Sequence, residues 1–324
     1  MPMALLPGLD REQLSAAGYL AGWRLVRLLP EKWAKRLFDW GADRASDDGR
    51  GMEQLRQNLA RVVGPENVTR ELVRNSMRSY MRYWREAFCL PSIHQDPDLH
   101  AKLLSGLQGL ENFDESMARG KGVILALPHT GNWDMAGVFL VGHYGQFTTV
   151  AERLKPEVLF DAFVDFRESL GFEVIALTGE KTSPFGRLKE VLEAGGVVCL
   201  VAERDLTRTG VTVDFMGEEA NMAAGPARLA METGAALHVV HSWFEDEGWG
   251  LSVSPQVEVT NVQETTQRLA DGFAANIKAH PADWHMLQPQ WNVDVERRAA
   301  DRAARRATKD KRTSQEKLED NGKK

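Results

Sequence analysis

Two side chains suited to acid–base chemistry lie five positions apart, in the segment Pro128-His-Thr-Gly-Asn-Trp-Asp134. An imidazole can take a proton from a hydroxyl near neutral pH, and a neighbouring carboxylate can fix its tautomer. In a turn that leads into a helix, a carboxylate at this spacing can fold back onto the ring. The alternative is a helix N-terminus where Asp134 complements the helix dipole and His129 is merely exposed. The spacing of His129 and Asp134 by itself favours the exposed histidine. The strand before the pair and the motifs after it favour a general base.

The run of residues just before His129 predicts its place in the fold. Residues 123–127 are all apolar, which is typical of a short strand buried on both faces. Pro128 ends the strand because it has no amide hydrogen for a ladder. Residues 132–134 indicate the first turn of a following helix. Active groups of open α/β sheets lie at this carboxyl edge, so His129 stands where catalytic groups are expected.

Charged residues also follow two other predicted strands. Glu152 follows residues 147–151, and Glu203-Arg204-Asp205 follows the strand predicted up to residue 202. Parallel strands bring their carboxyl ends to one edge, so these groups are expected to converge on His129. A base, an orienting carboxylate and arginines suit acyl transfer, in which an alcohol attacks an activated carbonyl and donors stabilise the oxyanion.

The motifs of several other chemistries are absent from the sequence. There is no Gly-x-Ser-x-Gly elbow, P-loop, Gly-x-Gly-x-x-Gly or His-Glu-x-x-His. No pattern points to a serine or cysteine nucleophile. Direct action of His129 on an acceptor alcohol therefore needs the fewest further groups.

From residue 106 onward, predicted strands and helices alternate. This rhythm predicts one α/β domain with a central, mostly parallel sheet flanked by helices. We assign residues 1–100 to an N-terminal helical region, 101–293 to the α/β core and 294–324 to a charged, mobile tail. Strands are expected at 123–127, 147–151, 172–177, 197–202, 211–215, 237–244 and 251–259.

The N-terminal region carries two patterns that suit a membrane surface. Predicted helices over 12–29 and 31–45 place Trp23, Trp33 and Trp40 near Lys32, Lys35 and Arg36, which suits a membrane interface but equally a helix packed on a core. A helix over 69–88 aligns five arginines that could bind lipid phosphate or form a solvated face paired with Glu71 and Glu86: Arg70, Arg74, Arg78, Arg82 and Arg85.

Overall composition excludes several classes of protein. The net charge of −6 argues against a general nucleic-acid binder. The two cysteines, Cys89 and Cys199, form no Cys-x-x-Cys, which fits a reducing compartment and no metal site. No signal peptide or membrane span is visible, so we expect a cytoplasmic protein able to lie on a membrane. Nothing demands more than a monomer.

The His-x4-Asp segment resembles that of the membrane-associated acyltransferases, and further segments resemble their lipid A-type branch. Within that branch the chain is most similar to the actinobacterial phosphatidylinositol mannoside acyltransferases, over about residues 15–293. The segments that carry this resemblance are Ala17–Arg27, Arg82–Phe88, Thr148–Glu157, Arg167–Val174, Ala202–Arg208 and Trp284–Trp291. The chain lacks the Phe-Pro-Glu-Gly-Thr-Arg-Ser block of the glycerolipid acyltransferases, so glycerol phosphate is not the expected acceptor.

The resemblance implies transfer of a fatty acyl chain, typically palmitoyl from palmitoyl-CoA, to the 6-hydroxyl of a mannose on a phosphatidylinositol mannoside. It implies a glycerolipid-acyltransferase-like fold, no cofactor beyond the acyl-CoA co-substrate, and a peripheral enzyme on the cytoplasmic face of the plasma membrane, in contact with anionic lipid. It makes membrane contact the favoured interpretation of the N-terminal patterns.

The same resemblance assigns roles by position. His129 becomes the base, Asp134 its partner and Glu203 the acid near the ring. Glu152 and Arg167 line the acceptor and donor pockets, and we expect Arg204 and Asp205 to contact substrate. Glu203 could instead pair with Arg204 or Arg208, and Arg167 could be a surface charge. Three other histidines are expected to be structural or solvated: His238, His241 and His285.

Two other functions remain open from the sequence. The acceptor could be another glycolipid, or the chain could be a non-catalytic lipid-binding protein of the same fold. The intact pair of His129 and Asp134 argues against the second, because a binding module has no need of a base.

Overall fold

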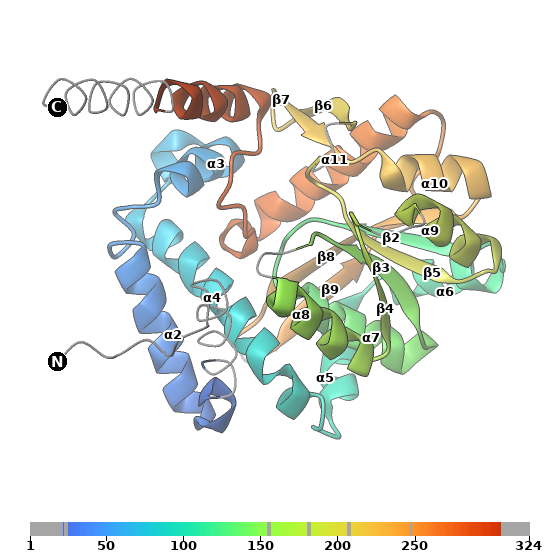
Figure 1. Cartoon of the computed structure of the whole chain (residues 1–324), viewed down its shortest axis with the longest axis horizontal. Coiled ribbons are helices and arrows are strands. Elements are labelled where there is room, and N and C mark those ends of the chain that lie inside the picture. Colours follow the sequence, from blue (N-terminus) through green and yellow to red (C-terminus); the bar gives the residue numbers. More distant parts are fainter. Residues whose placement is uncertain are drawn as a thin grey trace, which may run out of the picture.

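A seven-stranded sheet with helices on both faces forms the centre of the molecule (Figure 1). The computed structural model describes residues 22, 25–153, 157–179, 183–205, 209–246 and 248–305. The strand order is β1-β9-β8-β2-β5-β3-β4, and only the β8–β9 pair is antiparallel, so the predicted mostly parallel sheet is confirmed. The strands are β1 Leu107–Gln108, β2 Val123–Leu127, β3 Phe147–Ala151, β4 Phe172–Ala176, β5 Val197–Val201, β8 Ala236–Phe244 and β9 Trp249–Val253.

Alternation along β2 explains why its residues are apolar throughout. Successive side chains of a strand point to opposite faces. Ile124 and Ala126 enter a core with α9 (Pro184–Glu193), α10 (Gly225–Thr233) and α11 (Val262–Ala279). The other β2 side chains enter a second core, whose helices are α5 Leu99–Ser105, α6 Leu110–Ala118, α7 Trp133–Tyr144 and α8 Glu157–Ser169. Outside the main sheet, β6 (Val211–Phe215) pairs with β7 (Glu218–Met222) in a hairpin of which only the first strand was predicted.

The N-terminal helices pack beside this core and contain a small core of their own. They are α2 Glu31–Ala45, α3 Glu53–Val63 and α4 Arg70–Ile93, and α2 lies along α4 (Figure 1). Ala34, Phe38 and Ala42 form the buried face of α2. The opposite face exposes large apolar side chains beside basic ones: Trp33, Leu37 and Trp40, with Lys32, Lys35 and Arg36. Trp23 and most of the predicted helix over 12–29 lie outside the described residues.

The arginine stripe of α4 is paired within the protein. Asp48 accepts from Arg70 and Arg74, and Asp43 forms two hydrogen bonds with Arg78. Glu86 pairs with the remaining two arginines, Arg82 and Arg85. The contacts with Asp43 and Asp48 tie α4 to the C-terminal end of α2 and the turn after it. The stripe therefore agrees with the alternative in which the arginines pair with acidic residues of the protein. Glu86 is one of the expected partners, and Asp43 and Asp48 take the role that was expected of Glu71.

The chain continues past the α/β core as a helix. Residues 292–305 are helical, and Asp294, which is buried, accepts a hydrogen bond of 2.9 Å from Nη1 of Arg61 on α3. The rest of the predicted tail lies outside the described residues. Within the described ranges, none of the helices has the length and apolar character needed to cross a bilayer.

Candidate active site

The turn between β2 and α7 holds His129 at the carboxyl edge of the sheet. Gly131 has a φ of 52°, and a Cβ there would lie 2.6 Å from the carbonyl carbon of Ser242, so the turn requires glycine. Asn132 then caps α7 by accepting a hydrogen bond of 3.1 Å from the amide of Met135. The backbone carbonyl of His129 accepts from the amide of His285 at 2.8 Å. The histidine therefore stands on a backbone fixed on both sides.

Glu203, which follows β5, orients the imidazole. Its Oε1 accepts a hydrogen bond of 2.6 Å from Nδ1 of His129 and another of 2.8 Å from the His129 amide. The carboxylate is fully buried, whereas 36% of the His129 side chain is exposed. Burial raises the pKa of the Glu203 carboxyl, but the charge and hydrogen bonds of His129 outweigh burial and hold it below its ordinary value. A proton on Nδ1 leaves Nε2 as the acceptor, which is the form a general base needs.

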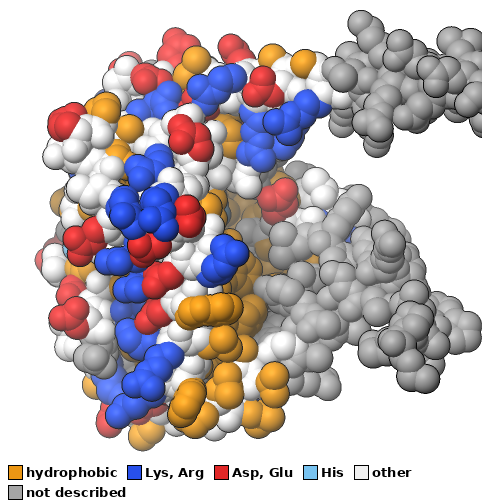
Figure 2. Space-filling model, turned by 90° about the vertical axis from the view of Figure 1, so that its left-hand side faces the viewer, with side chains coloured by type: hydrophobic (Ala, Val, Ile, Leu, Met, Phe, Trp, Pro, Cys, Tyr) orange, Lys and Arg blue, Asp and Glu red, His pale blue; other side chains and the backbone are white. Residues whose placement is uncertain are grey.

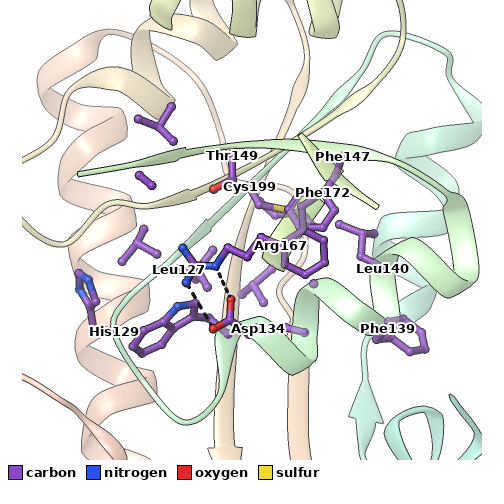
Figure 3. A pocket seen from close by; sticks show the side chains of 18 of the residues that line it. Leu127, His129, Asp134, Phe139, Leu140, Phe147, Thr149, Arg167, Phe172 and Cys199 are labelled. Carbon is purple, nitrogen blue, oxygen red and sulfur yellow. Dashed lines mark hydrogen bonds and ion pairs between the residues drawn. The ribbon is translucent and has the colours of Figure 1, made fainter. Parts of the chain in front are cut away.

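The predicted hydrogen bond between Asp134 and the imidazole is wrong. The Asp134 carboxylate instead accepts from Arg167 on α8, with 2.8 Å from Nε to Oδ1 and 3.3 Å from Nη2 to Oδ2 (Figure 3). Tyr83 on α4 donates its hydroxyl to Oδ2 at 3.1 Å. The physical reason is that Asp134 lies in the first turn of α7 and faces α8, while His129 stays at the strand end beside β5.

Asp134, Arg167 and Tyr83 affect the protonation of one another. Burial lowers the pKa of the Arg167 guanidinium, but the charge and hydrogen bonds of Asp134 outweigh burial and raise that pKa above its ordinary value. Burial and the charge of Asp134 raise the pKa of Tyr83 well above its usual range, so the phenol keeps its proton and donates. Arg167 is therefore a largely buried cation in contact with Asp134 and not a surface charge.

An apolar cavity of about 400 Å³ opens beside these groups and runs between the sheet and α7. His129 lies at one end, Asp134 and Arg167 lie in its wall, and Phe139 and Leu140 lie toward the other end (Figure 3). The wall on the sheet side comes from several strands: Leu125, Leu127, Phe147, Thr149, Cys199 and Val201. Burial raises the pKa of the Cys199 thiol, so it is a neutral wall group and not a nucleophile. A cavity with polar groups at one end and an apolar interior suits a fatty chain with a reactive head group.

The structure brings most of the predicted site residues to this cavity. Glu152 and Arg204 line it, together with His129, Asp134 and Arg167. Glu203 does not line the cavity itself, but its carboxylate bonds to His129, which does. Within the described residues it pairs with no arginine, Arg204 included. Asp205 is different: it does not line the cavity, and its Oδ2 accepts from the amide of Gly210 at 2.8 Å. Its carboxylate holds the backbone of Gly210, just before β6.

Two of the three other histidines are structural, as expected. His238 bonds to the carbonyl of Ser254 and to Ser116, and His241 bonds to Thr130. Burial, with the charge of His280, lowers the pKa of His241 to about 3, so this ring is neutral. His285 also has its pKa lowered to about 3 by burial and the charge of His129, but this ring lines the cavity.

Sequence reasoning missed His285 and Tyr83 as site residues. Nothing in the local pattern marks Tyr83, which is one aromatic residue among several on α4. His285 bonds through Nε2 to Ser79 at 2.9 Å, and Ser79 donates to Asp283 at 2.6 Å. These contacts join segments more than 200 positions apart, which no spacing rule could reveal. Among the residues the structure describes, no group of three acidic, histidine or cysteine side chains is arranged to hold a metal ion.

This fold and site define an acyltransferase of a known class. The chain belongs to the bacterial lipid A biosynthesis acyltransferase family, whose sequence profile matches residues 12–293. That range contains the whole sheet, the His129 turn and the cavity, which confirms the resemblance identified from the sequence.

Two similar proteins carry names that state an activity more narrowly than the family description does. The chain is 56% identical, over 295 residues, to the phosphatidylinositol mannoside acyltransferase of Mycolicibacterium smegmatis, an alignment that covers 89% of this chain and 95% of that protein. It is 56% identical, over 285 residues, to the phosphatidylinositol mannoside acyltransferase of Mycobacterium tuberculosis, covering 86% of this chain and 88% of that protein.

Proposed function

We propose that this chain is a phosphatidylinositol mannoside acyltransferase, which moves a fatty acyl chain from acyl-CoA to a mannose hydroxyl of the glycolipid. The observation that carries the proposal is a buried carboxylate orienting a half-exposed imidazole at the mouth of an apolar cavity. The similarity to two relatives of that name, over most of each protein, supports the acceptor. We propose palmitoyl as the chain and the mannose 6-hydroxyl as the site of transfer.

In the proposed reaction His129 is the general base. Its Nε2 takes the proton of the acceptor hydroxyl as the oxygen attacks the thioester carbonyl. The resulting imidazolium is stabilised by the Glu203 carboxylate at 2.6 Å from Nδ1. When the tetrahedral intermediate collapses, the carbon–sulfur bond breaks and the imidazolium returns the proton to the CoA thiolate. One proton therefore passes from the sugar to CoA through one ring.

Arg167 is the proposed donor to the oxyanion. Asp134 holds the guanidinium through Nε and Nη2, and Arg167 lines the same cavity as His129. A cation that is held rigidly before the reaction needs no reorganisation as negative charge develops on the carbonyl oxygen. On this proposal Asp134 and Tyr83 act through Arg167 and not through the imidazole.

Glu152 and Arg204 are the proposed substrate contacts at the mouth of the cavity. Glu152 is exposed, so its carboxylate can accept from sugar hydroxyls. Arg204 follows Glu203 directly in the sequence and lines the same cavity, where a phosphate of either substrate would be attracted to it. Asp205 is not part of this proposal.

The direct test incubates purified protein with palmitoyl-CoA and a phosphatidylinositol mannoside, and measures both free CoA and the acylated lipid. We expect CoA release that depends on the acceptor and a product acylated on a mannose. Transfer to other glycolipids, but not to the mannoside, would assign a different acceptor. Acyl-CoA binding without CoA release above background would identify a non-catalytic lipid-binding protein.

We further propose that the enzyme lies as a monomer on the cytoplasmic face of the plasma membrane, with α2 against the lipid. Trp33 is 64% exposed and Trp40 is 65% exposed, although their helix is packed on α4 through its other face. Figure 2 shows hydrophobic side chains beside Lys and Arg side chains on the face of the molecule that carries α2. Tryptophan and basic residues together suit the interface of an anionic bilayer.

Replacing Trp33, Leu37 and Trp40 together with serine should weaken sedimentation with anionic liposomes, because each removed side chain is apolar and exposed. A matched control replaces two exposed apolar residues elsewhere, Val158 and Met231, and should sediment like the unmodified protein. Equal sedimentation of all three proteins would remove α2 from the membrane contact.

A further inference from the structure

The cavity has a depth that the strand register defines. Thr149 pairs with Cys199, and Cys199 pairs with Leu125, so these three side chains lie at one level. Phe147 lies two residues before Thr149 on β3, and His129 lies four residues after Leu125 at the end of β2. At about 3.3 Å per residue, the Phe147 backbone therefore lies roughly 20 Å from the level of His129 along the strands. A fatty chain that enters beside His129 would run toward Phe147.

Helix α7 forms the opposite wall with one stripe of residues. Trp133, Gly137, Leu140 and Tyr144 recur at spacings of four, three and four, which places them on one face of the helix, and all four line the cavity. Gly137 lies about 6 Å along the helix from Trp133, at 1.5 Å per residue. It is the one member of this stripe without a side chain.

Glycine in a helix interior needs an explanation, since it costs about 1 kcal/mol relative to alanine. At Gly137 the explanation is a close approach of two rings. A Cβ there would lie 2.6 Å from Cζ of Phe172 and 3.0 Å from Cζ of Phe147. The two rings contact each other, with centroids 4.7 Å apart, and both line the cavity (Figure 3).

We propose that Gly137, Phe147 and Phe172 form a constriction that sets the length of the fatty acyl chain the cavity accepts. The rings of Phe147 and Phe172 are almost fully buried in a close-packed core, so the free space beside them is the cavity itself. A methyl group at position 137 displaces the rings into that space. The deeper part, toward Leu140 and Tyr144, is then closed to the end of a long chain.

This inference rests on the proposed function and is tested by donor preference. The experiment measures kcat/KM for acyl-CoA donors from decanoyl-CoA to stearoyl-CoA, with a phosphatidylinositol mannoside as acceptor. In Gly137→Ala we expect kcat/KM for palmitoyl-CoA to fall about tenfold relative to lauroyl-CoA, the loss that corresponds to about two methylenes excluded from the cavity. A matched control is Gly186→Ala in α9, where a Cβ would meet nothing within 4 Å, and its profile should equal that of the unmodified protein.

Two further variants keep the inference open to contradiction even if Gly137→Ala folds poorly. Phe172→Leu removes the ring atom nearest to position 137, so alone it should move the preference toward stearoyl-CoA. Combined with Gly137→Ala it should restore use of palmitoyl-CoA. An unchanged chain-length profile in Phe172→Leu, or in a folded Gly137→Ala, overturns the inference. Failure of the unmodified protein to transfer any chain overturns the proposed function instead.

Discussion

Replacing His129 with alanine is expected to lower kcat for acyl transfer by about 10²–10⁴-fold, the usual contribution of a positioned general base. In the proposed reaction the imidazole accepts the hydroxyl proton and later returns it to the CoA thiolate. Its removal also deprives the buried Glu203 of its side-chain partner and leaves it the backbone amide of residue 129, which destabilises the fold by about 1–3 kcal/mol. The measurement is steady-state CoA release, with circular dichroism to verify that the variant is folded.

Two comparisons make this result specific to the base. His129→Asn supplies an amide hydrogen for Glu203 without a group that can take the proton, and it should be as slow as the alanine variant. His94→Ala, at the exposed end of α4, should keep the full rate. If a folded His129→Ala kept more than a tenth of the rate, another residue would be the base.

Replacing Asp134 with alanine is expected to lower kcat by about 10²–10³-fold, the usual effect of losing one oxyanion donor. The loss arises because Arg167 is no longer held, and Arg167→Ala should cost about as much. Residues that act as one unit are not additive. The double variant should therefore be no slower than Arg167→Ala alone.

The same double-mutant cycle separates the two roles considered for Asp134. If the rate losses of Asp134→Ala and Arg167→Ala multiply in the double variant, Asp134 acts independently of Arg167. It would then act on the His129 imidazole, as the sequence spacing predicted. Tyr83→Phe is a milder probe, because it removes the hydroxyl that donates to the Asp134 carboxylate at 3.1 Å and keeps the carboxylate itself. It should lower the rate less than Asp134→Ala while leaving the Arg167 contact in place.

The fold could be predicted because its signals are local. The apolar run before Pro128, the strand-like segments and the helices between them each follow from a few neighbouring residues, and their alternation implies a parallel sheet. The hairpin partner β7 was missed because Glu218–Met222 carries polar residues on its exposed side and has no run of apolar ones.

The candidate site could be predicted only in part. The parallel strands explain why Glu203 and Glu152 could be expected near His129. The partner of the imidazole could not be chosen from spacing, since Asp134 is near in sequence and Glu203 is near in space. Tyr83 and His285 come from α4 and from the loop after α11, and only tertiary packing brings them to the cavity.

The most direct test of the central claim is the tautomer of the neutral His129 ring, read by nitrogen-15 NMR in the unmodified protein, in Glu203→Gln and in Asp134→Asn. Glu203 accepts from Nδ1 at 2.6 Å and so holds the ring proton on that nitrogen. We expect the proton on Nδ1 in the unmodified protein and in Asp134→Asn, and we expect Glu203→Gln to lose this preference together with most of its acyl transfer rate. A tautomer that changes in Asp134→Asn and is kept in Glu203→Gln would contradict the pairing of His129 with Glu203.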